Sequence, residues 1–216
     1  MIAVYSYRWV PDFARGLVRD LRVRWALEEA GLPYEPRLVN VGPERDLPEF
    51  RAMQPYGQIP IYVEDDLVMF ESGAIALHVA EKSEALLPRD PKRRAGATCW
   101  LFSALNTIEP VIQELTSMDL FFADQPWMPG RRAALEPMVR KRLAELSAAL
   151  SDKDYLDGRF TVGDLMMVTV LRIPRHTDLV AEHPNLAAYV MRCEARPAFQ
   201  KALGDQMAAF EDQPAA

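Results

Sequence analysis

The sequence contains little cysteine and no pattern of residues that typically holds a metal. Only two of its 216 residues are cysteine, Cys99 and Cys193, and only three are histidine. Both cysteines lie in apolar helical patterns without a Cys-x-x-Cys spacing, so we expect two buried thiols, no disulfide framework and no zinc site. His78, His176 and His183 show no metal spacing, and we interpret them as structural residues.

Long apolar runs and an excess of positive charge are also missing. No uncharged run approaches the roughly 20 residues that a membrane-spanning helix needs, and the N-terminal segment reaches a charged residue at Arg8, too early for a signal peptide. The formal net charge is −6, and acidic residues outnumber basic ones most clearly in residues 1–84. We therefore expect a cytoplasmic protein that has neither a membrane nor a nucleic acid as its partner.

Two hydrophobic periods alternate through the first 84 residues. Short runs of β-branched and aromatic residues predict strands, and apolar residues spaced three or four apart predict helices. The order that results is βαβαββα, an α/β layer in which the first strands are parallel and the last two are antiparallel. The expected strands are 2–7, 36–41, 58–63 and 67–70, and the expected helices are 17–30, 48–53 and 72–82.

The rest of the chain has only helical patterns. Pro88 and Pro91 disfavour a helix and predict an exposed linker, so we expect domains at 1–84 and 93–216 joined by residues 85–92. Within the second domain we expect Pro110 and Pro137 to kink or delimit a helix and Pro174 to end one. The expected helices are about 92–119, 130–151, 161–173, 185–195 and 197–210.

The segment Tyr56–Pro60 places a proline inside a predicted central strand, where it cannot donate a ladder hydrogen bond. If the Ile59–Pro60 peptide bond is cis, the backbone N–H and C=O of Ile59 can turn away from the sheet. They could then pair with an extended peptide as a neighbouring strand would. The alternative is a trans proline at the entrance of an ordinary strand.

Eleven residues later, a predicted strand runs directly into a helix at Glu71 and Ser72. Ser72 is a plausible N-cap, and the first N–H groups of the helix form an anion site. Because Glu71 could receive an ammonium group, the pair forms a receptor for the α-amino acid end of a ligand. The alternative is an ordinary helix cap without a ligand.

Together these motifs resemble the glutathione-binding segment of soluble glutathione transferases. The resemblance implies a thioredoxin-like N-terminal domain and an all-helical C-terminal domain. It also implies that Ile59 pairs with the cysteinyl unit of glutathione, that Pro60 is the family's cis-proline, and that glutathione is a co-substrate. The remaining implied contacts are Glu71 and Ser72 with the γ-glutamyl end, Gln58 near the same ligand, and Arg51 with the glycyl carboxylate, unless Arg51 is merely solvated.

A second match lies in Phe160–Leu165, where Thr161 is suited to cap a helix and Asp164 to bond back to it. This pattern resembles the capping element of the family's buried C-terminal helix. Its expected role is in folding.

The family pattern fails at the thiol-activating position. Residues 9–30 contain no hydroxyl or thiol side chain. Tyr7 could reach the site over a longer loop, or helix N–H groups with Arg15 or Arg19 could stabilise the thiolate. Arg15, Arg19 and Arg22 could equally form a surface stripe. A third possibility is that the protein binds glutathione without conjugating it.

The resemblance implies a homodimer that presents the glutathione thiolate to a small hydrophobic electrophile. Two classes of alternative stay open, because a fold does not fix a reaction. One is a non-catalytic glutathione-transferase-like interaction module, and the other is a glutathione-dependent isomerase, dehalogenase or peroxidase. The residues that could face the electrophile, by location alone, are Trp100, Asn106, Met118 and Phe122.

Overall fold

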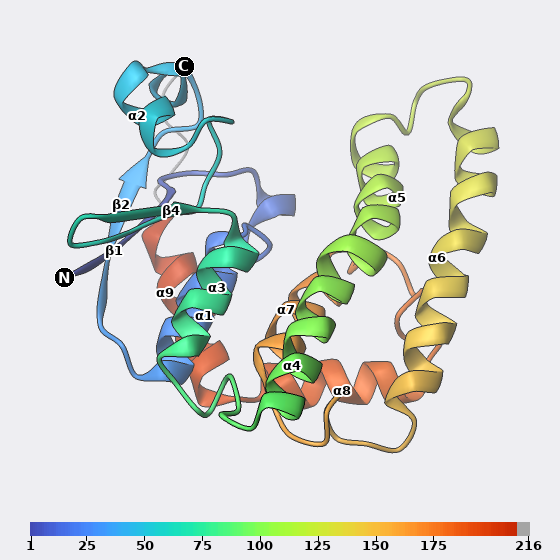
Figure 1. Cartoon of the computed structure of the whole chain (residues 1–216). Helices are drawn as coiled ribbons and strands as arrows, with labels where there is room; N and C mark the ends of the chain where they lie inside the picture. Colours follow the sequence, from blue (N-terminus) through green and yellow to red (C-terminus); the bar gives the residue numbers. More distant parts are fainter. Residues whose placement is uncertain (211–216) are drawn as a thin grey trace. The chain divides into compact units, whose positions relative to one another are not determined.

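The computed structural model describes residues 1–210, and its chain divides into two compact units (Figure 1). The first unit comprises Met1–Leu87 together with the C-terminal segment from Ala195, and the second is Pro88–Glu194. The domain limits expected from the sequence, 1–84, 85–92 and 93–216, stay a prediction.

A four-stranded sheet forms the centre of the first unit, in the order β2-β1-β3-β4. As expected, β1 is parallel to β2 and β3 is antiparallel to β4. The structure also pairs β1 with β3, in antiparallel orientation. The strand expected to contain Pro60 begins only at Ile61, so the proline precedes the ladder and does not interrupt it. The strands are β1 (Ile2–Tyr7), β2 (Tyr34–Val39), β3 (Ile61–Glu64) and β4 (Leu67–Phe70).

Pro36 lies inside β2, two residues after the strand begins at Tyr34. The sequence placed this strand two residues later, at 36–41. Because β2 is an edge strand, a missing backbone N–H is tolerated there.

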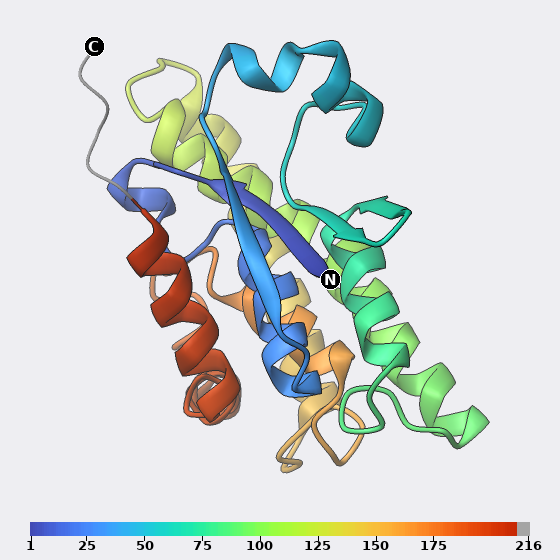
Figure 2. The ribbon, with the colours of Figure 1, turned by 90° about the vertical axis from the view of Figure 1, so that its left-hand side faces the viewer.

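Side chains alternate between the two faces of β1. On one face Ser6 accepts a hydrogen bond from Arg24 of α1, and on the other Tyr5 packs edge-on against Phe50 of α2. Helix α1 contacts both α3 and α9, and Figure 2 shows α9 (red) running beside α1 (blue). The helices of this unit are α1 (Asp20–Ala30), α2 (Pro48–Met53), α3 (Ser72–Glu81) and α9 (Pro197–Ala209), with 3-10 turns at Asp12–Ala14 and Pro43–Asp46.

The second unit is helical, as expected. The single helix expected at 92–119 is divided by a π-helical turn at Ala104–Ile108, because Pro110 lacks an N–H and clashes with the preceding turn. Pro137 lies inside α6. The helices are α4 (Pro91–Ser103), α5 (Glu109–Phe121), α6 (Met128–Leu150), α7 (Val162–Leu171) and α8 (Pro184–Glu194).

The capping element expected before α7 is confirmed. Thr161 Oγ1 accepts a hydrogen bond from the Gly163 N–H at 3.2 Å, and Asp164 accepts one from the Thr161 N–H at 2.9 Å. Asp164 also accepts a hydrogen bond from the buried hydroxyl of Tyr189 at 2.9 Å. Burial raises the pKa of Asp164, and these hydrogen bonds offset part of that shift.

One of the two cysteines departs from expectation. Both are free thiols, and Cys193 is buried, but Cys99 is exposed. The buried stripe of α4 contains Ala97 and Leu101, and Cys99 lies two positions from each, on the opposite face.

None of the helices among residues 1–210 combines the length and the apolar character needed to cross a membrane. The same residues contain no group of three or more His, Cys, Asp or Glu side chains that could hold a metal ion.

Candidate functional site

The backbone of Ile59 is available to a ligand. The Ile59–Pro60 peptide bond is cis, in agreement with the sequence-based expectation. The side chain of Ile59 is buried against Phe50 and Ile61. Within residues 1–210, neither the N–H nor the C=O of Ile59 has a hydrogen-bond partner. Ile59 is therefore anchored by its side chain, and its polar backbone atoms can pair with an extended peptide.

Arg51 braces the loop that precedes Ile59. Its Nη1 donates to the Pro55 carbonyl at 2.9 Å, and its Nη2 pairs with Asp46. Gly57 has φ +63°, a backbone conformation that favours glycine, and a Cβ there would lie 2.7 Å from Cζ at the flexible end of the Arg51 side chain. The Arg51 guanidinium is thus already paired with the Pro55 carbonyl and Asp46. Its contact with a glycyl carboxylate stays a prediction.

The turn into α3 differs from the expected cap by one residue. Glu71 is the N-cap, with φ 70°, and Ser72 is the first residue of the helix. The positive φ turns the chain from β4 into α3 immediately, so the capping position falls on Glu71. A non-glycine residue at positive φ costs about 1 to 3 kcal/mol and is commonest at functional sites. The exposed Glu71 side chain has no partner within the described part of the chain and can receive an ammonium group.

Ser72 has a buried arginine behind it. Arg22 Nη1 donates to Ser72 Oγ at 3.2 Å, and both residues are almost fully buried. Because a guanidinium only donates hydrogen bonds, Ser72 keeps its own proton for another acceptor. That proton and the first N–H groups of α3 are suited to a carboxylate.

The surface interpretation of the arginine stripe is wrong for Arg22. Helix α1 begins only at Asp20, so Arg15 lies outside it and the three arginines do not share a helical face. Arg15 lies 3.3 Å from Asp12, and Arg19 is the exposed N-cap. No local pattern could have revealed the burial of Arg22, since it depends on packing between α1 and α3.

Arg24, on the same helix, is also buried. It donates to Asp20 at 2.8 Å and to Ser6 at 2.9 Å. Burial raises the pKa of Asp20, although Arg24 and Gln206 of α9 both donate hydrogen bonds to its carboxylate. The start of α1 is thus tied to β1 and to α9.

Tyr7, at the end of β1, lies at the same edge of the sheet as Ile59. Its ring packs against the cluster that contains Phe50, Ile59 and Ile61. Arg45 Nη1 donates to the Tyr7 hydroxyl at 3.0 Å and to the Gly57 carbonyl at 3.3 Å. The sequence interpretation named Tyr7 and missed Arg45, whose partners are distant in the chain.

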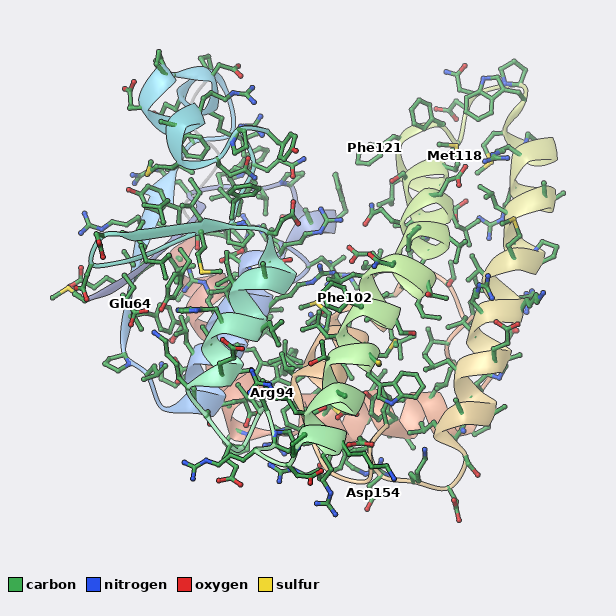
Figure 3. The ribbon with its side chains drawn as sticks, in the orientation of Figure 1. Glu64, Arg94, Phe102, Met118, Phe121 and Asp154 are labelled. Atoms are coloured by element: carbon green, nitrogen blue, oxygen red, sulfur yellow. The ribbon has the colours of Figure 1, made fainter. Side chains whose placement is uncertain are left out.

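The four residues proposed to face an electrophile lie in the second unit. Trp100 and Met118 are half-buried, and Asn106 is exposed in the π-helical turn. Phe122 packs against Trp127 with ring centroids 5.7 Å apart. Figure 3 shows Met118 near the end of α5. Their role stays a prediction.

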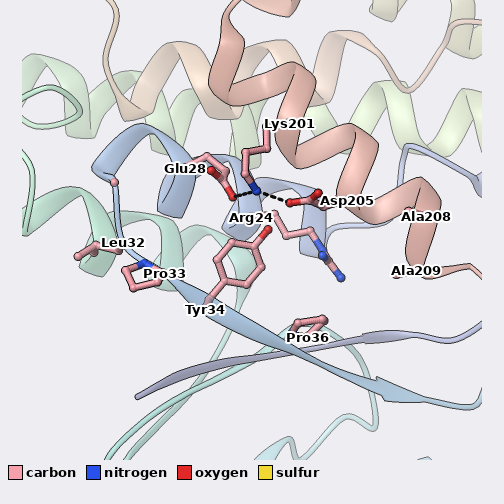
Figure 4. Close-up of a pocket in the computed structure, with 11 residues that line it drawn as sticks. Arg24, Glu28, Leu32, Pro33, Tyr34, Pro36, Lys201, Asp205, Ala208 and Ala209 are labelled. Atoms are coloured by element: carbon pink, nitrogen blue, oxygen red, sulfur yellow. Dashed lines mark hydrogen bonds and ion pairs between the residues drawn. The ribbon is translucent and has the colours of Figure 1, made fainter.

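A separate cavity of about 640 Å³ lies beside α9 in the first unit (Figure 4). Lys201 bridges Glu28 and Asp205 at its edge, with distances of 2.9 Å and 2.6 Å. None of the residues expected to bind glutathione lines it, so it is distinct from the candidate site. Its lining residues are Arg24, Glu28, Gly31, Leu32, Pro33, Tyr34, Pro36, Lys201, Asp205, Ala208 and Ala209.

Two family models match the chain. The glutathione S-transferase N-terminal domain matches residues 14–81, and the glutathione S-transferase C-terminal domain matches residues 130–197. The first match covers Ile59, Glu71 and Ser72 and begins after Tyr7.

Known proteins are similar over most of the chain. A glutathione S-transferase from Hyoscyamus muticus is 31% identical over 85% of this chain and 92% of its own length. Glutathione S-transferase 3 from Zea mays is 34% identical over 84% of this chain and 86% of its own length. A glutathione transferase from Burkholderia graminis, solved with two glutathione molecules per subunit, is 27% identical with a TM-score of 0.78, covering 94% of this chain and 87% of that one. The chain belongs to the glutathione S-transferase family.

Proposed function

We propose that the protein is a glutathione transferase that transfers the glutathione thiolate to a small hydrophobic electrophile. The observation that carries the proposal is a set of three unused groups just before β3 and just after β4, at the same end of the antiparallel pair in which Ile61 lies opposite Phe70. These are the unpaired backbone of Ile59, the carboxylate of Glu71 and the proton of the Ser72 hydroxyl. They match an extended peptide backbone, an ammonium group and a carboxylate, which glutathione carries together.

In the proposed complex, the cysteinyl unit of glutathione pairs with the Ile59 backbone, and the γ-glutamyl end reaches Glu71 and Ser72. Gln58 is exposed and has no partner among the described residues, so it is free to contact the same ligand. Pro60 completes the turn beside Ile59. Arg51 stays a candidate for the glycyl carboxylate.

Tyr7 is the proposed activator of sulfur. The thiol proton leaves to solvent, and the Tyr7 hydroxyl donates a hydrogen bond to the thiolate. The thiolate then forms a sulfur–carbon bond with the electrophile, and the leaving group departs with the electron pair of the bond that breaks. Arg15 and Arg19 are the second candidates, since positive charge also stabilises a thiolate.

The two plant relatives are named glutathione S-transferases, which favours this function over the interaction module and over the isomerase, dehalogenase and peroxidase alternatives. The test is calorimetric titration with glutathione, followed by turnover assays with a panel of electrophiles and peroxides. Saturable binding with conjugation of an electrophile supports the proposal. Binding without any turnover would favour the interaction module, and no binding would remove the proposal altogether.

We also propose a homodimer, as the family resemblance implies. Exposed apolar side chains on β4, Leu67, Val68 and Phe70, support an interface with a second copy. Light scattering would test it, and a monomer at assay concentration would contradict it. A cytoplasmic location is likewise a proposal, to be tested by cell fractionation.

A further inference from the structure

We propose that Arg45 is a positioning residue that directs the Tyr7 hydroxyl proton toward the sulfur of glutathione. The inference rests on the proposed function and adds a residue to it. Arg45 comes from the 3-10 turn Pro43–Asp46, between β2 and α2, and its guanidinium reaches the end of β1.

The direction of the hydrogen bond between Arg45 and Tyr7 follows from chemistry. A guanidinium carries five N–H donors and no acceptor, so the Tyr7 oxygen must accept from Arg45 at their separation of 3.0 Å. The single proton of the Tyr7 hydroxyl then has to be donated elsewhere. Among residues 1–210 no side chain or backbone group accepts it. The hydroxyl is therefore a donor held ready for an acceptor that the protein itself does not supply.

The same nitrogen of Arg45 also fixes the place of that donor. Nη1 reaches the Gly57 carbonyl at 3.3 Å, two residues before Ile59. The ring of Tyr7 packs against the cluster that contains Ile59. Arg45 thus ties the hydroxyl to the backbone that is proposed to run along the cysteinyl unit, whose thiolate is the natural acceptor.

Arg45 and the nearby Arg51 have different hydrogen-bond partners. Arg51 holds Asp46 and the Pro55 carbonyl, and none of its hydrogen bonds reaches Tyr7. Arg45 alone joins the hydroxyl to the loop before Ile59. Removal of Arg45 leaves the Tyr7 hydroxyl free to rotate and to donate to water, which weakens its bond to sulfur.

The test is the pKa of the thiol of bound glutathione, followed by the ultraviolet absorbance of the thiolate in protein saturated with glutathione. In the wild-type protein this pKa should lie well below the value of about 8.5 for a free thiol. Arg45→Gln should raise it by about one unit, a tenfold loss of thiolate near neutral pH. Arg45→Lys keeps a positively charged donor group and should retain part of the wild-type lowering of the thiol pKa. Arg37→Gln, at an exposed arginine of β2, is the matched control and should change nothing.

A double-mutant cycle separates positioning from a general structural effect. Tyr7→Phe removes only the hydroxyl, and in that background Arg45→Gln should give no further rise of the thiol pKa. A further rise of the same size would overturn the inference, because Arg45 would then act without Tyr7.

Affinity for S-methylglutathione, which has no thiol, provides the second measurement. Arg45→Gln should leave it within about twofold of wild type, since no directed bond to a thiolate is lost. A large loss of this affinity with an unchanged thiol pKa would overturn the inference and assign Arg45 to a ligand carboxylate. If the wild-type protein itself leaves the thiol pKa unshifted, the proposed function and the inference both fail. If wild type and Arg45→Gln lower it equally, only the inference fails.

Discussion

The two ends of the candidate site are built in different ways. At the end proposed to bind the γ-glutamyl group, Glu71 and Ser72 are adjacent in the chain, and the turn into α3 presents both. At the end proposed to hold the thiol, Tyr7, Arg45 and Gly57 come from three separate segments. A binding site made from one continuous turn can be predicted from a sequence. An activating site assembled from three separate segments cannot.

The two ends share one hydrogen-bonding arrangement. In each, an arginine donates to a hydroxyl oxygen, Arg22 to Ser72 at 3.2 Å and Arg45 to Tyr7 at 3.0 Å. Each hydroxyl is thereby left with a proton to donate. The ligand groups proposed at the two ends, a carboxylate and a thiolate, are both anions that accept such a bond.

The comparison predicts that the ends can be separated by mutation, and the largest effect belongs to the thiol end. Tyr7→Phe should lower kcat/KM by about 10²-fold, the usual worth of a positioned proton donor. Glutathione affinity at pH 6, where the free thiol is protonated, should be nearly unchanged. Steady-state kinetics and calorimetry measure the two quantities. The control is Tyr5→Phe, two residues earlier in β1 and on the same face of the sheet. Equal activity of the two variants would remove Tyr7 from the mechanism.

Ser72→Ala tests the other end. Loss of a hydrogen bond to a charged group should weaken glutathione binding by about 1 to 3 kcal/mol. The pKa of the bound thiol should stay at the wild-type value, because Ser72 lies at the end proposed to bind the γ-glutamyl group. Calorimetry gives the affinity, and Ser83→Ala just beyond α3 is the control. Unchanged affinity for Ser72→Ala would exclude Ser72 from the site.

The loop before Ile59 connects the two ends, and Gly57→Ala should disturb it. The positive φ predicts a loss of about 1 to 2 kcal/mol of unfolding free energy, because the flexible end of Arg51 can move away from an added Cβ but the backbone strain remains. Urea denaturation measures it. Gly204→Ala, in α9 with open space around its Cα, should be neutral or stabilising. Equal stability of the two variants would show that the Gly57 loop is less constrained than its geometry implies.

The smallest effect lies outside both ends, at Glu64. A hydrogen bond from Lys82 lowers the pKa of Glu64 from 4.5 to about 2, against the effect of burial. Because the folded pKa is the lower one, this contribution to stability is present above pH 4.5 and is lost as the pH falls toward 2. Glu64→Gln should therefore cost about 1 kcal/mol or less at neutral pH and nothing near pH 2. Denaturation at several pH values checks this, and a difference that persists at pH 2 would contradict it.

Much of the fold could be predicted because its signals are local. Strand β1, helix α2 and strand β4 have the expected bounds, and the Thr161 cap has its expected bonds. The start of β3 at Ile61 differs from the expected start at residue 58, because periodicity does not show that a proline precedes a ladder. Arg22 and Arg45 were beyond local patterns, since their hydroxyl partners lie 50 and 38 residues away in the chain.

The most direct test is a crystal structure of the protein with glutathione. We expect the cysteinyl N–H and C=O to pair with the Ile59 backbone, the γ-glutamyl carboxylate to contact Ser72, and the sulfur to lie within about 3.5 Å of the Tyr7 hydroxyl. Glutathione bound elsewhere, for example in the cavity beside α9, would contradict the whole site. Glutathione on Ile59 with its sulfur turned away from Tyr7 would contradict the thiol end alone.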